Sequence, residues 1–287
     1  MSDDLFRDLD GALAPNTLRA YRSDFRRFER WCLRAAIDPL AASGDQVAAF
    51  IEDSIDHRSA ATIRRGVASL STLFTLNGYP DPTRTPPVKL ALKRMYRRLG
   101  RAQKQAYPLT RDLLEQLLAA CRDDVLGERD RVLLLLGYET MRRRAELCAL
   151  RFEDLEQLPK GKRALRLRFS KTDQYGKGRL LPVSDRLYRA LATWGERVGH
   201  AGTILRSVDR YGHVRGPLPP SAINRRLRAL QATAKLDIDG QLSGHSFRVG
   251  AALDLLEAGE PLVKIMLRGG WSSETTAIKY LREWQEV

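Results

Sequence analysis

The sequence predicts a mostly helical protein that contains a small antiparallel β-hairpin and is divided into two domains. Apolar residues recur at three- and four-residue spacing along most of the chain, which is typical of amphipathic helices. One stretch, residues 164–183, instead alternates apolar and polar residues, which indicates the hairpin. The 287 residues exceed one average domain. We expect residues 1–104 and 105–287 to be the two domains.

The first domain is expected to contain four helices, each introduced by a residue that favours a helix start. They span residues 15–36, a segment after Ser43, 59–76 and 88–99. In the first of them, apolar residues follow one face, and arginines follow another at positions 19, 22, 26 and 30. An arginine stripe of this kind suits either a solvated surface or a surface that binds a polyanion.

The charge balance also favours a polyanionic partner. Lys and Arg number 49 against 35 Asp and Glu, a net charge of +14, and such an excess attracts phosphate. The longest apolar run, residues 132–136, is far shorter than the roughly 18 residues of a membrane-spanning helix. The N-terminus has no apolar signal region, so we expect nucleic acid rather than a membrane as the partner, and a cytoplasmic, nucleoid-associated location. The three cysteines and four histidines have neither disulfide nor metal-site spacing.

A basic run separates the two halves of the chain. No acidic residue occurs between Pro82 and Arg111, whereas nine residues there are basic. Unopposed positive charges repel one another unless a polyanion or solvent screens them. We favour a polyanion-facing helix that leads into a linker at residues 101–108; the alternative is a flexible, exposed linker.

The second half begins near Thr110 and is again mainly helical. Its expected helices span residues 111–121, 128–138, 143–150, 185–198, 221–236, 246–258, 261–267 and 273–285. The hairpin alternation places Leu165 and Leu167 on one face of the first strand, and the second strand ends at Val183.

Four short motifs in this half combine residue types suited to phosphate chemistry. Arg143 begins an Arg-x-x-Glu-Leu sequence, and residues 243–252 are Ser-Gly-His-Ser-Phe-Arg-Val-Gly-Ala-Ala. A Gly-Gly-Trp sequence ends at Trp271, and Tyr280 follows nine residues later. Guanidinium, imidazole and indole N–H groups donate to phosphate oxygens, and a phenol can act as a nucleophile.

In this order and spacing, the motifs resemble the catalytic domain of the tyrosine recombinase (phage integrase) family, and the likeness extends more loosely over the whole chain. The resemblance implies a two-domain, C-shaped DNA clamp with a helical core-binding, SAM-like domain at 1–104 and a catalytic domain at 105–287. It implies a site-specific recombinase that cleaves and rejoins double-stranded DNA through a 3′-phosphotyrosine and a Holliday junction. It also implies a homotetramer on paired sites and a reaction that needs no metal or other cofactor.

The resemblance also assigns roles to individual residues. Tyr280 is the nucleophile, and Arg143 and Arg248 hold the non-bridging phosphate oxygens. His245 donates a hydrogen bond to the phosphate and is a candidate base toward the tyrosine. Trp271 stands where many relatives have a second histidine, and its indole can donate but cannot exchange a proton. For Tyr280, His245 and Trp271 a purely structural role is the alternative.

Any of three arginines, residues 142–144, could be the first arginine that holds the phosphate. The family pattern Arg-x-x-Glu-Leu selects Arg143, because Glu146 and Leu147 follow it at the right spacing. We expect Glu146 to support the site geometry, with a surface ion pair as the alternative. Met141-Arg142 replaces the usual Gly-Leu of the family, which puts the local packing in doubt.

The leaving 5′-oxygen needs a proton, which the resemblance assigns to Lys171 in the hairpin, with Lys177 as the alternative. Asn224, Arg225 and Arg228 lie on one edge of a helix and are residue types that bind adenine and guanine; phosphate contact or solvation stays open for each. The expected DNA contacts are Arg22, Arg26, Arg64, Lys93, Arg94, Arg97, Arg98, Asn224, Arg225 and Arg228.

Two other functions compete with recombination. A type IB topoisomerase uses a similar constellation but relaxes supercoils as a monomer. A non-catalytic DNA-binding protein on a recombinase scaffold is the alternative from another class, although such a scaffold tends to lose active-site residues. In similar recombinases, a helix after the nucleophile docks into the neighbouring subunit. Only seven residues follow Tyr280 here, too few for a linker and such a helix. We therefore expect a monomer in free solution and tetramers only on paired sites.

Overall fold

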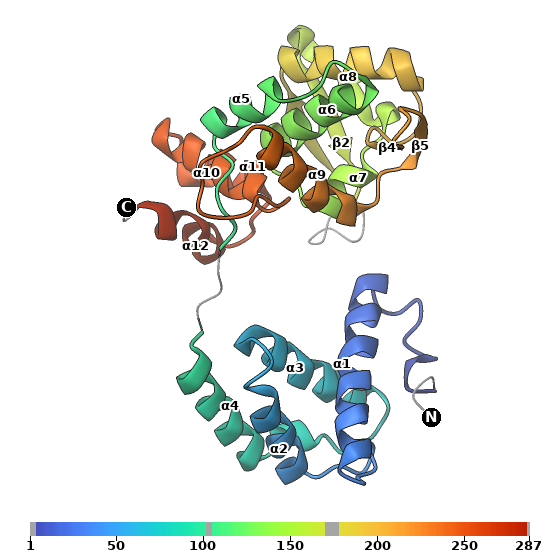
Figure 1. The fold of residues 1–287 in the computed structure, drawn as a ribbon, viewed down its shortest axis with the longest axis vertical. Helices are drawn as coiled ribbons and strands as arrows, with labels where there is room; N and C mark the ends of the chain where they lie inside the picture. Colours follow the sequence, from blue (N-terminus) through green and yellow to red (C-terminus); the bar gives the residue numbers. More distant parts are fainter. Residues whose placement is uncertain (1–3, 102–104, 170–177, 286–287) are drawn as a thin grey trace. The chain divides into compact units, whose positions relative to one another are not determined.

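The computed structural model describes residues 4–101, 105–169 and 178–285, with only the helical backbone described at 279 and 282–285. It is mostly helical, as the sequence predicts, and forms two compact units, residues 1–104 and 105–287 (Figure 1). No helix in these described ranges is both long and apolar enough to cross a membrane.

The N-terminal unit consists of four helices: α1 (Pro15–Arg34), α2 (Gly44–Ser54), α3 (Ala60–Leu76) and α4 (Pro86–Leu99). Short 3-10 helices precede α1 (η1, Asp4–Phe6) and α4 (η2, Pro82–Arg84). Ser43 caps α2 by accepting a hydrogen bond from the Gln46 amide, and the Gln46 side chain accepts one from the Ser43 amide. This reciprocal cap explains why α2 begins where the sequence predicts.

The core of the N-terminal unit lies between two helix pairs. Helix α1 packs against α3, and α2 packs against α4. Their apolar faces meet in one cluster that includes Phe25, Phe28, Ile51 and Leu73, all at most 2% exposed. The opposite face of α1 is exposed and carries Arg19, Arg22, Arg26 and Arg30.

The C-terminal unit is larger and is arranged around α6 (Val125–Thr140), whose apolar run from Val132 to Leu136 is buried. Helix α6 packs against α5 (Arg111–Ala119), α8 (Asp185–Val198) and α10 (Ser246–Glu257). The remaining helices are α7 (Arg144–Ala149), α9 (Pro220–Thr233), α11 (Leu262–Gly269) and α12 (Glu274–Gln285). Single-turn 3-10 helices occur at η3 (Phe152–Asp154) and η4 (Pro159–Gly161).

Two small antiparallel sheets complete this unit. The predicted hairpin is confirmed as β2 (Arg163–Leu167) and β3 (Arg179–Val183), with Leu165 opposite Leu181. A strand that the sequence did not indicate, β1 (Leu155–Gln157), extends it to the order β1-β2-β3. Strands β4 (Arg206–Val208) and β5 (Val214–Pro217) pair separately and were also not predicted, because three or four residues carry too little alternation to detect.

The chain enters the C-terminal unit along α10. The Leu109 amide donates to the Ser246 carbonyl at 3.0 Å, and a side chain at Gly250 would overlap the Leu109 backbone. Gly250 of the Arg-Val-Gly-Ala-Ala sequence is therefore needed for close approach of the backbone.

Candidate active site

Arg143 is placed by the junction between α6 and α7. It precedes the first turn of α7, and Glu146 lies in that turn. The Glu146 carboxylate accepts a hydrogen bond from the Arg143 amide at 3.1 Å and from its guanidinium at 2.8 Å. Burial alone would raise the pKa of Glu146, but these hydrogen bonds outweigh it and hold the pKa below its usual value. Glu146 is only 6% exposed, so its contact with Arg143 is not a surface ion pair.

The departure from the usual Gly-Leu is accommodated at this same junction. Met141 ends α6 in a left-handed conformation, with φ of 54°, where a glycine is favoured. Arg142 is buried and donates to the carbonyls of Thr140 (2.7 Å) and Arg268. Burial lowers the pKa of Arg142 to about 10, which leaves it charged at neutral pH. Arg142 therefore joins the start of α7 to the end of α11, a role that the sequence analysis missed.

Arg248 reaches the site from the first turn of α10. Its side chain is 1% exposed and donates to the Met141 carbonyl at 2.6 Å, while its Nε has no hydrogen-bond partner among the described residues. Burial and the nearby charge of Arg143 lower its pKa to about 10. The guanidinium carbon lies 4.8 Å from the centre of the Trp271 ring.

Trp271 and Tyr280 complete this cluster of side chains. Helix α11 ends at Gly269, and Gly270 adopts a left-handed conformation with φ of 67° that turns the chain toward Trp271. The indole is 7% exposed, and its N–H has no partner within the described ranges. The Tyr280 ring on α12 lies 5.2 Å from the Trp271 ring and 5.0 Å from the His245 ring, centre to centre.

His245 lies immediately before α10 and is surrounded by positive charge. Desolvation and the guanidiniums of Arg248, Arg143 and Arg144 lower its pKa to about 4. Part of the side chain is exposed to solvent, so screening weakens the charge effect, but burial and charge act in the same direction. The imidazole is therefore neutral at physiological pH and has one nitrogen free to accept a proton.

These residues have the donors and the positive charge that suit an anion. A buried N–H without a partner costs about 1–3 kcal/mol, and two such groups, on Arg248 and Trp271, belong to side chains in direct contact. A bound anion with several acceptor oxygens would satisfy them and offset the repulsion between the arginines. A phenol lies beside the same groups. The arrangement suits nucleophilic attack on a phosphodiester.

The structure brings together Arg143, Glu146, His245, Arg248, Trp271 and Tyr280, all from the C-terminal unit. Lys171 and its alternative Lys177 lie outside the described residues.

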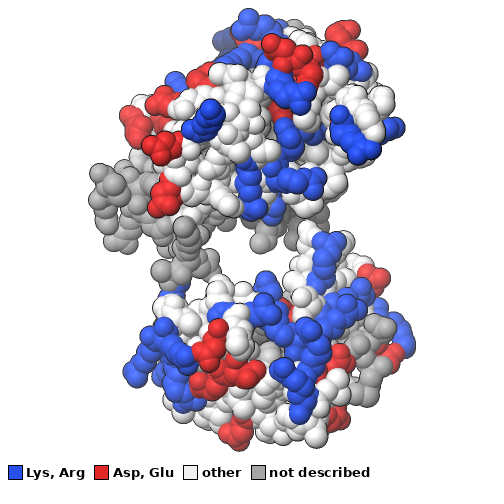
Figure 2. All heavy atoms as spheres, viewed as in Figure 1, with Lys and Arg blue, Asp and Glu red and all other residues white. Residues whose placement is uncertain are grey.

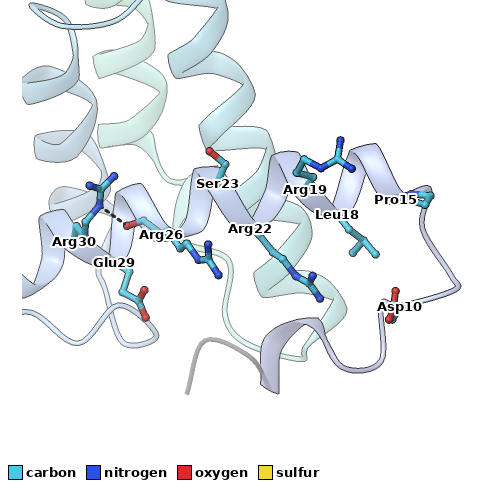
Figure 3. A pocket seen from close by; sticks show the side chains of 9 residues that line it. All are labelled: Asp10, Pro15, Leu18, Arg19, Arg22, Ser23, Arg26, Glu29 and Arg30. Atoms are coloured by element: carbon cyan, nitrogen blue, oxygen red, sulfur yellow. Dashed lines mark hydrogen bonds between the residues drawn. The ribbon is translucent and has the colours of Figure 1, made fainter. Parts of the chain in front are cut away.

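The predicted DNA contacts of the N-terminal unit lie on exposed surfaces. Arg22 and Arg26 extend from the same side of α1 beside an open hollow of about 770 Å³ (Figure 3). Arg64 on α3 and the four predicted contacts of α4 (Lys93, Arg94, Arg97 and Arg98) are also exposed. Basic side chains spread over the visible face of each unit, with acidic groups among them (Figure 2).

The expectation that the basic run is unopposed is wrong for part of α4. Arg94 pairs with Glu52 at 2.6 Å, and Arg98 pairs with Asp56. Both acids come from the α2 segment, more than 40 positions earlier, so a local charge count could not detect them. No comparable acidic partner is found for Lys93 or Arg97 among the described residues.

On α9, Arg225 and Arg228 are exposed, but Asn224 is half-buried. Its side-chain oxygen accepts a hydrogen bond from the Gly244 amide at 3.0 Å. A bidentate contact with adenine uses this oxygen as well as the amide nitrogen, so the oxygen would have to accept a second hydrogen bond while it is held by Gly244.

A phenol, two arginines, an imidazole and an indole around one anion site, on a mainly helical scaffold, define the class of tyrosine recombinases. The chain belongs to the phage integrase family: residues 108–286 match the family's catalytic domain, and residues 4–76 match the phage integrase N-terminal SAM-like domain. The predicted family is thereby confirmed.

Curated relatives match over nearly the whole chain. An integrase/recombinase XerD homologue of Selenomonas ruminantium is 29% identical over 96% of this chain and 84% of its own length. Recombinase Cre of Escherichia phage P1 is 27% identical over 97% of this chain and 87% of its length. Among solved structures, a lambda integrase tetramer bound to a Holliday junction superposes with a TM-score of 0.70 at 20% identity, covering 99% of this chain and 78% of that one.

Proposed function

We propose that this protein is an active site-specific DNA recombinase whose nucleophile is Tyr280. The observation that carries the proposal is the cluster of side chains around the Tyr280 ring, in which the buried N–H groups of Arg248 and Trp271 have no partner among the described residues. A structural tyrosine cluster has no need of unsatisfied donors, whereas a phosphate site requires them.

In the proposed reaction, the Tyr280 oxygen attacks the scissile phosphorus. The new bond is a 3′-phosphotyrosine, and the bond from phosphorus to the 5′-oxygen breaks to release a 5′-hydroxyl. Arg143, Arg248 and the Trp271 indole stabilise the charge on the non-bridging oxygens. Neutral His245 takes the tyrosine proton, either directly or through water. We assign protonation of the leaving oxygen to Lys171 on the family resemblance.

Rejoining reverses these steps with the 5′-hydroxyl of another strand as the attacking group. Because one phosphoester replaces another, the exchange needs no external energy source. We propose that four copies assemble on two sites and exchange one pair of strands at a time through a Holliday junction. Support comes from the lambda integrase relative, whose tetramer was solved on such a junction.

We further assign residues 1–104 to core-site binding and residues 105–287 to catalysis. Exposed basic residues on α1, α3, α4 and α9 would contact the duplex, mainly at phosphates. The protein would therefore act at the nucleoid.

The proposal is tested by selecting bound duplexes from random DNA and incubating the protein with a version of the selected site that is nicked near the scissile phosphate. A covalent protein–DNA band should form on a denaturing gel, with or without EDTA. Tyr280→Phe should bind the same duplex and form no band, a loss of at least about 1000-fold. Relaxation of supercoiled plasmid without strand exchange would point to a topoisomerase, and persistence of the band in Tyr280→Phe would refute the assignment.

A further inference from the structure

Helix α9 holds the segment before His245 through two carboxamide side chains. Asn224 and Gln231 are seven residues apart, about two turns, and so lie on the same side of the helix. Asn224 accepts from the Gly244 amide at 3.0 Å, and Gln231 accepts from the Leu242 amide at 2.9 Å. Gln231 also donates to the Gly240 carbonyl at 2.7 Å.

These bonds replace the secondary structure that the segment lacks. Residues 240–243 belong to no helix or strand, yet Leu242 is fully buried, so its amide needs a protein acceptor. The Gly244 and Leu242 amides are N–H donors, so the oxygen of Asn224 must face Gly244 and that of Gln231 must face Leu242, while the Gln231 nitrogen faces the Gly240 carbonyl. The path is fixed from the other side as well, since a side chain at Gly244 would overlap that of Arg144 on α7, the helix beside α9 (Figure 1).

The position of His245 follows from this segment. The His245 amide donates to Ser243 at 3.3 Å, and Ser243 is bonded through its own amide to the Ser246 hydroxyl at 2.9 Å. A displacement of Gly244 would therefore move the imidazole that lies beside the Tyr280 ring.

We propose that Asn224 and Gln231 are positioning residues that set His245 against Tyr280 through the segment from Gly240 to Gly244. Only the expected effect on DNA cleavage rests on the proposed function; the positioning of His245 does not. Since exposed Arg225 and Arg228 lie on the same helix, the helix expected to contact DNA is also the one that holds the histidine. Asn224 thus supports the active site from a helix that is expected to contact DNA.

The test compares two Asn224 variants in the full chain. Asn224→Ala removes the acceptor for Gly244, and we expect the single-turnover cleavage rate at saturating nicked duplex to fall about 10- to 100-fold, because small misplacement of a catalytic group is costly. Asn224→Asp keeps an acceptor oxygen at the same place, so it should recover most of that loss, although its negative charge should weaken DNA affinity. Thr233→Ala, an exposed change at the end of α9, is the matched control.

Two measurements without DNA separate this proposal from the proposed function. In Asn224→Ala, hydrogen exchange of the segment around Gly244 should accelerate at least about 10-fold, and the NMR titration midpoint of His245 should move. In Asn224→Asp the exchange should stay slow. If the unchanged protein forms no covalent band but these shifts occur, recombination is wrong and positioning stands. If Asn224→Ala cleaves at the normal rate, or leaves both DNA-free measurements unchanged, the positioning role is overturned.

Discussion

Two buried charged residues, Asp24 in the N-terminal unit and Arg248 in the C-terminal unit, differ in how their hydrogen bonds are satisfied. In the N-terminal unit, Asp24 is 2% exposed and accepts four hydrogen bonds, from Arg65 (3.0 and 2.8 Å), Ser69 (2.8 Å) and Arg27 (2.6 Å). In the C-terminal unit, buried Arg248 donates to the Met141 carbonyl, its Nε has no partner among the residues that the structure describes, and the neighbouring charge of Arg143 lowers its pKa. A charge whose partners are all supplied by the protein stabilises the fold, whereas a charge with missing partners marks a place for a ligand.

The largest expected effect is on stability in the N-terminal unit. Asp24→Ala leaves Arg27 and Arg65 without their buried partner and should destabilise α1 and α3 by about 3–5 kcal/mol. Hydrogen exchange of the full chain would show this loss within residues 4–101, while Asp45→Ala, an exposed carboxylate on α2, should change little.

The same cluster should depend on pH. Burial alone would raise the pKa of Asp24, but the bonds from Arg65 and Ser69 outweigh it and lower the pKa below its ordinary 3.8. The contribution of Asp24 is therefore complete above the ordinary pKa and is lost as pH falls through the lowered one. Protection of α1 that vanished already near neutral pH would contradict this account.

Arg248→Lys should slow the cleavage reaction, whereas Asp24→Ala lowers stability. The substitution should change DNA affinity little. A lysine keeps the positive charge but not the planar fork of donors. We expect the rate of covalent adduct formation to fall about 100- to 1000-fold. Comparing this rate with the dissociation constant of the selected duplex separates the two effects. An equal loss in both would mean that Arg248 only binds DNA.

The titration of His245 reports both its burial and the positive charge around it. In the DNA-free protein its NMR titration should have a midpoint near pH 4, and Arg144→Ala should raise that midpoint by removing one repulsive charge. Bound DNA should raise it as well, because phosphate favours the imidazolium. Since the unfolded chain binds a proton at a higher pH, the folded state should lose stability as pH falls from about 6.5 toward 4. A midpoint near 6.5 without DNA would show that neither burial nor the arginines act on the imidazole.

The smallest effect concerns salt. Removing one basic side chain that neutralises a phosphate should flatten the slope of log K against log salt by about 0.9. Changing Arg94, Arg97 and Arg98 together to alanine removes only one charge that has no described acidic partner, so we expect a change of about one unit rather than three. An unchanged slope would mean that α4 does not contact DNA, and a change near three would mean that Glu52 and Asp56 release their arginines on binding.

Most of the helices, the hairpin and the order of the active-site motifs could be predicted from the sequence. Helical periodicity and caps are local properties, so Ser43 and the apolar run of α6 were sufficient to place their elements within a few residues. The motif from Arg143 to Tyr280 is likewise defined by residue types and spacing. Strands β1, β4 and β5 were missed because each is shorter than the pattern that detects a strand.

Tertiary structure alone decided which polar groups meet. Arg142 looked like one of three equivalent arginines, yet packing buries it against a carbonyl 126 positions away. The sequence predicts a DNA contact for Asn224 but not its hydrogen bond from Gly244. Arg94 has no acidic neighbour in the sequence, yet Glu52 of α2 pairs with it. Side-chain chemistry fixes what a residue can donate or accept, but the partner is chosen by the packing of distant segments, which no local pattern in the sequence records.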